Sequence, residues 1–162
     1  MNLLILAAAP VLIIAIFIYI RDRYEKEPIG LLLKTLLAGS LTTIPVVFVN
    51  GWLAGYSEYF TGLSQAGYTA FVMAACVEEF FKFLALYLLI WRNREFNEKF
   101  DGIVYAVYIS LGFALVENIM YVTNYGEEAG YMRALTAVPA HALFGVTMGY
   151  YFAFAKFGHL HA

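Results

Sequence analysis

Five long apolar stretches, separated by short polar segments, constrain this chain more than any other feature of its sequence. A helix that crosses the hydrocarbon core of a bilayer needs about 20 mostly apolar residues, and each stretch has about that length. Hydrophobic residues make up 62% of the 162 residues and charged residues only 14%, whereas a typical soluble domain has about 25% charged residues. The sequence therefore predicts an all-α fold, a polytopic transmembrane bundle of about five spans. The predicted spans are Leu3–Ile20, Ile29–Leu53, Gly67–Trp91, Gly102–Thr123 and Ala134–Phe157.

The polar segments between the spans are too short to separate independent folding units. No Gly/Ser-rich linker, low-complexity tract or internal repeat interrupts the chain. Strands of a membrane barrel would need segments of about ten alternating residues, and the apolar stretches do not alternate. We therefore expect one integral-membrane domain over residues 1–162, which lies in the cell membrane as a multi-pass protein.

Basic residues are distributed unevenly among the polar segments. Lysine and arginine gather at the cytoplasmic ends of membrane spans. Eight of the ten basic residues lie around the first loop, in the third loop or near the C-terminus, whereas the second loop has none and the fourth has only Arg133. This asymmetry predicts an N-terminus outside the cell and a C-terminus inside it. The eight residues are Arg21, Arg23, Lys26, Lys34, Arg92, Arg94, Lys99 and Lys156.

Charge and cysteine content exclude several classes of protein. The formal net charge is −2, so the chain lacks the net positive charge of a typical nucleic-acid binder. Cys76 is the single cysteine, and no disulfide can form within the chain. The composition therefore predicts the lipid bilayer as a partner and no nucleic acid.

Ionisable residues break the apolar pattern of the last three spans. The third span contains Glu78, Glu79 and Lys82, the fourth contains Glu117, and the fifth contains His141. A charge at the centre of a membrane helix costs about 2.5–3.5 kcal/mol, so the four charged groups without partners would cost on the order of 10 kcal/mol. On a helix, Lys82 can reach either neighbouring carboxylate. The remaining negative charge then requires a protonated carboxyl, a cationic His141 or a metal ion.

The expected depths of these groups in the bilayer allow them to form one site. At about 1.5 Å per residue, Glu117 and His141 lie roughly 10 Å below the outer ends of their spans, and Glu78 roughly 16 Å below Gly67. All three fall in the outer half of the bilayer or near its midplane. A carboxyl beside water in such a place suits proton transfer near neutral pH. We therefore favour a catalytic site over a buried cluster that only sets helix register.

Three motifs, in order on successive spans, resemble those of the PrsW family of glutamic-type intramembrane proteases, which is related to the CAAX prenyl protease group. The matching elements are Glu78-Glu79-x-x-Lys82, Phe113-x-x-x-Glu117-Asn118 and Pro139-Ala-His141, and the loop from Arg21 to Pro28 also resembles that family's first cytoplasmic loop. The resemblance covers nearly the whole chain. Because members of the family continue through further helices, the resemblance implies that this chain is a shortened or minimal form.

The resemblance implies hydrolysis of a peptide bond inside or at the edge of the bilayer. Its substrate would be a single-span, membrane-anchored regulatory protein similar to an anti-sigma factor. Glu78 would act as general base on a water that Glu117 helps to hold, while Glu79 pairs with Lys82, although helical spacing alone does not distinguish Glu78 from Glu79. His141 would polarise the scissile carbonyl or protonate the leaving amine.

Two further residues of the motifs are expected to support this chemistry. Asn118 would serve as an amide donor, and Lys82 and Phe113 would be supporting residues of the site. No serine lies beside a suitable base, and Cys76 has no obvious one, so we expect water as the nucleophile in preference to a covalent acyl-enzyme. The hypothesis needs no cofactor and no metal.

Three alternatives stay open on the sequence. Glu78, Glu117 and His141 could bind Zn²⁺ in an intramembrane metalloprotease, although the chain has no His-Glu-x-x-His motif. The charged residues could instead line the path of a proton- or cation-coupled transporter or channel, although no inverted repeat is evident. A third alternative is a non-catalytic membrane scaffold in which the buried charges specify packing.

Overall fold

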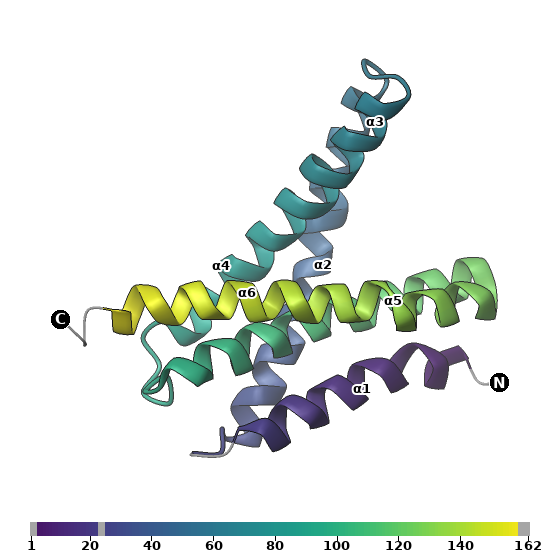
Figure 1. Cartoon of the computed structure of the whole chain (residues 1–162). Coiled ribbons are helices and arrows are strands. Elements are labelled where there is room, and N and C mark those ends of the chain that lie inside the picture. Colours follow the sequence, from purple (N-terminus) through teal and green to yellow (C-terminus); the bar gives the residue numbers. More distant parts are fainter. Residues whose placement is uncertain (1–2, 23–24, 159–162) are drawn as a thin grey trace.

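The computed structural model describes residues 3–22 and 25–158, and most of them are helical (Figure 1). No strand occurs in these residues, which confirms the predicted all-α class. Arg23, one of the basic residues behind the predicted orientation, lies outside the described residues. The helical elements are α1 (Leu3–Arg21), α2 (Ile29–Ser57), α3 (Leu63–Gly67), the π-helical segment η1 (Tyr68–Val77), α4 (Glu78–Ile90), α5 (Lys99–Leu135) and α6 (Ala137–Phe157).

Three helical stretches of the described chain are long and apolar enough to cross a membrane. They are Leu3–Arg21, Ile29–Ser57 and Lys99–Phe157, and the third of these contains both α5 and α6. The first two agree with predicted spans. The predicted span Gly67–Trp91 forms η1 and α4, whose winding changes at Glu78. A helical membrane protein is thus confirmed, whereas the number of five spans and the orientation stay predictions.

The helix α5 lies at the centre of the fold, and α1, α2 and α6 all pack against it. Its residues from Val104 to Ala114 are buried on every face. Where α2 crosses α5, Gly112 has no room for a side chain, because a β-carbon there would lie 1.9 Å from the backbone oxygen of Leu36. Close backbone contact of this kind is typical of packed membrane helices.

Large apolar side chains cover the outer faces of α1, α2 and α4 instead of being buried. Contiguous exposed apolar surface of this extent is rare on soluble monomers, and a surrounding bilayer would cover it. The distribution agrees with a membrane protein whose polar groups face inward. Examples with more than half of the side chain exposed are Ile5, Ile13, Phe17, Leu41, Phe48, Phe80 and Leu88.

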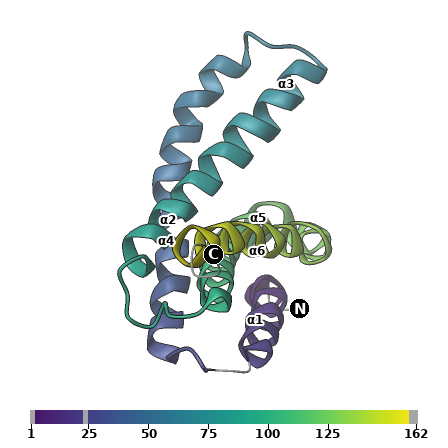
Figure 2. The same ribbon diagram turned by 60° about the vertical axis from the view of Figure 1, so that its left-hand side comes forward.

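The segment 124–135 differs from the expected outer loop. We expected irregular structure after Thr123, but α5 continues to Leu135. Gly126 interrupts its regular geometry with φ 80° and ψ −168°, a left-handed conformation that residues with a β-carbon rarely adopt. The short helical segment after Gly126 folds back and leads into α6, so that α5 and α6 lie side by side (Figures 1 and 2).

The hairpin of α2 with α3, η1 and α4 diverges from α5 and α6. Figures 1 and 2 both show α4 close to α6 at one end, with the distance between η1 and α6 increasing toward α3. The residues where the two parts separate include Glu78 and Glu79, at the start of α4. The fold therefore places these carboxylates where a cavity can open between helices.

Candidate active site

The first two turns of α4 carry two carboxylates and a lysine that contacts both of them. Lys82 Nζ lies 2.7 Å from Glu79 Oε1 and 3.5 Å from Glu78 Oε2. Both pairs have the i, i+3 and i, i+4 spacing of an α-helix, as the sequence predicts. The Lys82 side chain is completely buried, so its charge requires these carboxylates as partners.

Lys82 also connects α4 to α5 and α6. Its Nζ atom lies 3.1 Å from His141 Nδ1 on α6 and 4.1 Å from the centre of the Phe113 ring on α5. An ammonium group only donates hydrogen bonds, so His141 Nδ1 is an acceptor. A neutral imidazole with Nδ1 as acceptor carries its proton on Nε2. Phe113 packs edge-on against the same imidazole, with ring centres 5.5 Å apart.

Glu117 of α5 contacts the other ring nitrogen of His141. The Nε2 atom lies 2.9 Å from Glu117 Oε2, and the same oxygen lies 2.5 Å from Arg133 Nη2. Because Nε2 carries the proton, it donates to the carboxylate. Glu117 is thus held by two donors from residues on either side of the turn between α5 and α6.

Arg133 is the residue of this site that sequence reasoning missed. Its position in an expected outer loop, 16 residues after Glu117, suggested only a topological role. The fold-back at Gly126 returns it to the cluster, where it supplies a second cation beside Lys82. Two cations here face the three carboxylates, so the excess negative charge is one and not the two expected with Lys82 alone.

Asn118 has both ends of its side-chain amide engaged. Its Nδ2 donates to the backbone oxygen of Ala7 in α1 over 3.2 Å, and its Oδ1 accepts from Arg133 Nε over 2.7 Å. Only 2% of the residue is exposed. The structure therefore places Asn118 between α1 and Arg133, away from the carboxylates of α4.

A cavity of about 360 Å³ lies between η1 and α6, next to these side chains. This volume is within the usual range for small-molecule sites, about 300–1,000 Å³. Its η1 wall belongs to a π-helix, a rare form that is frequent at functional sites. Apart from the charged residues and His141, its lining is apolar and mostly alanine. The lining residues are Ala70, Phe71, Ala74, Ala75, Glu78, Glu79, Glu117, Arg133, Ala137, Ala140, His141 and Phe144.

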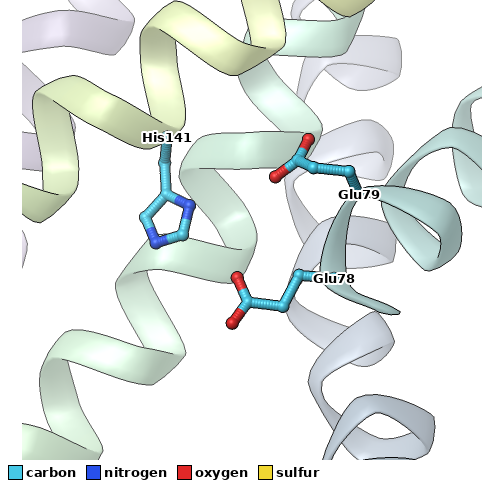
Figure 3. A group of neighbouring side chains, drawn as sticks. All are labelled: Glu78, Glu79 and His141. Carbon is cyan, nitrogen blue, oxygen red and sulfur yellow. The ribbon is translucent and has the colours of Figure 1, made fainter. Parts of the chain in front are cut away.

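Glu78, Glu79 and His141 are close enough to bind one metal ion together. Each offers one ligand atom, and these atoms lie within 4.8 Å of one another; Figure 3 shows both carboxylates on the side of α4 that faces the imidazole. The buried Glu79 Oε2 has no hydrogen-bond partner among the described residues. Carboxylates and imidazole suit catalytic Zn²⁺, so the donor set fits. Lys82 Nζ, which contacts all three residues, would have to move aside.

Acidic groups and an imidazole around a cavity, within an apolar helical chain, define a candidate membrane-embedded hydrolase. Residues 27–162 match the model of the family described as PrsW family intramembrane metalloprotease. The chain belongs to the PrsW protease family, and it is therefore a peptidase of the intramembrane class.

Individual relatives agree with this family over most of the chain. The chain is 39% identical over 156 residues to a Protease PrsW of Geobacillus kaustophilus, covering 96% of this chain and 68% of that protein. It is 37% identical over 161 residues to a Protease PrsW of Clostridioides difficile, covering 97% and 67%, respectively. A Protease PrsW of Bacillus subtilis is 33% identical over 153 residues, covering 92% and 66%. No solved structure matches the chain.

Proposed function

We propose that this chain hydrolyses a peptide bond in or near the membrane segment of a single-span, membrane-anchored regulatory protein, similar to an anti-sigma factor. The observation that carries the proposal is the position of Glu78. Its carboxylate borders the cavity between η1 and α6, opposite His141. A base, a proton donor and room for a peptide thus occur together inside a membrane fold.

Among the three carboxylates, Glu78 is the best candidate for the general base. Glu79 is tied to Lys82 at 2.7 Å, and Glu117 accepts from both Arg133 and His141. Glu78 has the longest ion pair of the three, at 3.5 Å from Lys82, so it is the most available to accept a proton from water. The water would then attack the scissile carbonyl without a covalent enzyme intermediate.

The other site residues orient the reacting groups. The Lys82 ammonium holds Glu79 and the His141 imidazole on one side of the cavity. Before the reaction, Glu117 orients the His141 ring by accepting its Nε2–H. The same Nε2–H then turns from Glu117 to the substrate and polarises the scissile carbonyl or protonates the leaving amine, while Lys82 keeps its contact with Nδ1. The charges of Glu79 and Lys82 compensate each other, so that Glu78 carries the negative charge next to the substrate.

A divalent metal is the second candidate for activating the water, because the donor set of Glu78, Glu79 and His141 fits one. Zn²⁺ held by these residues would act as a Lewis acid and lower the pKa of a bound water. Metal analysis of the purified protein tests this candidate. Metal-dependent cleavage that chelation abolishes and Zn²⁺ restores would favour it, and chelator-resistant cleavage would favour the glutamate base.

The membrane arrangement that we propose has five spans in a single domain over residues 1–162. The N-terminus lies outside and the C-terminus inside, in the cell membrane. This arrangement places Glu78, Glu117 and His141 in the outer half of the bilayer or near its midplane. The cut would then fall near the extracytoplasmic edge of the substrate's membrane segment.

The central experiment measures cleavage of candidate single-span substrates by the protein reconstituted in liposomes, with products mapped by mass spectrometry. General acid–base catalysis contributes about 10²–10⁴ in rate, so Glu78→Gln should lose at least about a hundredfold in kcat. Glu58→Gln, an exposed glutamate at the end of α2, is the matched control and should retain full activity. A folded Glu78→Gln, Glu79→Gln double variant that still cleaves would refute the glutamate-base mechanism.

A further inference from the structure

Arg133 forms a two-nitrogen contact with neighbouring acceptors on α5. Its Nη2 donates to Glu117 Oε2 over 2.5 Å, and its Nε donates to Asn118 Oδ1 over 2.7 Å. The guanidinium also lies 4.2 Å from the ring centre of Tyr121. Arginine suits such a site because its planar group can donate in two fixed directions while stacking on an aromatic face.

The surrounding structure holds this guanidinium in one position. Asn118 is itself fixed by its hydrogen bond to Ala7 of α1, and Gly126 allows the chain to fold back toward Glu117. Only 11% of the Arg133 side chain is exposed. A charge that is largely buried and makes directed hydrogen bonds is unlike a surface lysine or arginine, which gains little from a single ion pair.

The contact from Arg133 bears directly on His141. Glu117 Oε2 accepts from both Arg133 Nη2 and His141 Nε2, so the arginine holds the oxygen that accepts the imidazole N–H. On the other side of the ring, Lys82 Nζ donates to Nδ1. The imidazole is thus fixed from both sides, and one of the two fixed points depends on Arg133.

We propose that Arg133 is a positioning residue that holds the Glu117 carboxylate in one orientation, so that Glu117 accepts from His141 Nε2 and fixes the imidazole ring. A carboxylate that accepts the N–H of a functional histidine is a common way to orient its ring. The role in catalysis rests on the proposed function, whereas the effect on the hydrogen bond between His141 and Glu117 does not depend on a substrate.

The first experiment follows the hydrogen bond from His141 Nε2 to Glu117 by nitrogen-15 NMR of histidine-labelled protein in liposomes, without substrate. Replacing His159 and His161 by alanine leaves His141 as the only source of signal. Because Lys82 still donates to Nδ1, both the parent protein and Arg133→Gln should carry the proton on Nε2, but the Nε2 signal of Arg133→Gln should be shifted and broadened, since Glu117 loses its fixed orientation. Arg94→Gln, in the exposed loop before α5, is the matched control and should leave the signal unchanged. An unchanged Nε2 signal in a folded Arg133→Gln protein overturns the proposal.

The second experiment separates binding from chemistry in the cleavage assay. Loss of a residue that orients a catalytic ligand typically costs about 10–100-fold in activity, so Arg133→Gln should lower kcat by about that factor and leave KM within about twofold. Arg133→Lys keeps the charge but not the two-nitrogen contact, and it should fall between the parent and Arg133→Gln. If Arg133→Gln does not insert, the lysine variant is used in both assays, and an unchanged kcat together with an unchanged Nε2 signal overturns the proposal.

Failure of the Arg133 proposal and failure of the proposed function would give different results. An unchanged imidazole signal overturns the role of Arg133 even when Glu78→Gln is inactive. Continued cleavage by the Glu78→Gln, Glu79→Gln double variant removes the glutamate-base mechanism, while a shifted Nε2 signal in Arg133→Gln still supports the positioning of His141.

Discussion

Glu27, in the loop between α1 and α2, should make the stability of this protein fall as the pH rises. Only 5% of its surface is exposed, and it lies among other buried acids, with Asp22 and Asp101 each 2% exposed. Tyr105 donates a hydrogen bond to its Oε2 atom. Burial raises the pKa of Glu27 from 4.5 to about 8; the Tyr105 hydrogen bond lowers it in part, and Asp101 raises it further.

The sign and size of the effect follow from proton linkage. Between pH 4.5 and pH 8, the folded protein binds more protons at Glu27 than the unfolded chain does, so the free energy of unfolding decreases as pH rises. The stabilisation is fully present below pH 4.5 and is lost as the pH rises through about 8. At 1.36 kcal/mol for each factor of ten in the proton affinity, the loss amounts to about 3–5 kcal/mol.

The substitution Glu27→Gln removes this titration and keeps a group of similar shape. The glutamine amide can still accept from Tyr105 and can donate to Asp101. We expect the variant to match the parent near pH 5, and to be more stable by about 3–5 kcal/mol near pH 8.5. The tryptophan fluorescence of the protein in detergent, followed through unfolding at several pH values, measures the difference.

Glu25→Gln is the matched control, because Glu25 lies in the same loop and is exposed. It should leave the pH dependence of the parent unchanged. Equal slopes for the parent and Glu27→Gln between pH 5 and pH 8.5 would refute the reasoning, since no proton would then be taken up at Glu27 on folding.

Three further predictions test the packing, the ion pairs and the membrane orientation. Lys82→Met leaves buried carboxylates without their cation and should destabilise the protein by about 3–5 kcal/mol, measured by unfolding in detergent. Gly112→Ala should cost about 1–3 kcal/mol or more in the same assay, because its β-carbon would meet a backbone oxygen of α2 at 1.9 Å. In a Cys76→Ala background, an impermeant thiol reagent added outside intact cells should label Ser64→Cys and spare Asn97→Cys; the reverse pattern would contradict an external N-terminus.

Local parts of the site could be predicted from the sequence with good accuracy. The contacts of Lys82 with Glu78 and Glu79 depend only on helical spacing, and both occur in α4 as expected. Glu78, Glu117 and His141 also line one cavity, which their expected depths in the spans allow. The ion pairs were predictable because an α-helix has a known rise and a known set of neighbouring side chains.

Other parts of the site could not be predicted in this way. The segment after Thr123 is polar enough to suggest a loop, and nothing in its composition indicates that Arg133 returns to Glu117. Gly126 was the one signal that could have suggested a fold-back, because glycine readily adopts positive φ. The π-helical winding of η1 could not be predicted from the sequence either, since its apolar, alanine-containing sequence is also compatible with an α-helix.

The sequence by itself determined the membrane class, the helical content and the pairing of charges within α4. The membrane class and the helical content depend on free energies that add along a continuous segment, such as the transfer of apolar side chains into lipid. The pairing of charges depends on neighbours within one helix. Only the tertiary structure decided which distant groups satisfy each carboxylate. The contacts of Glu117 with Arg133 and His141 depend on a single backbone conformation at Gly126 and on how α6 packs against α5, and neither is encoded in the local pattern of residues.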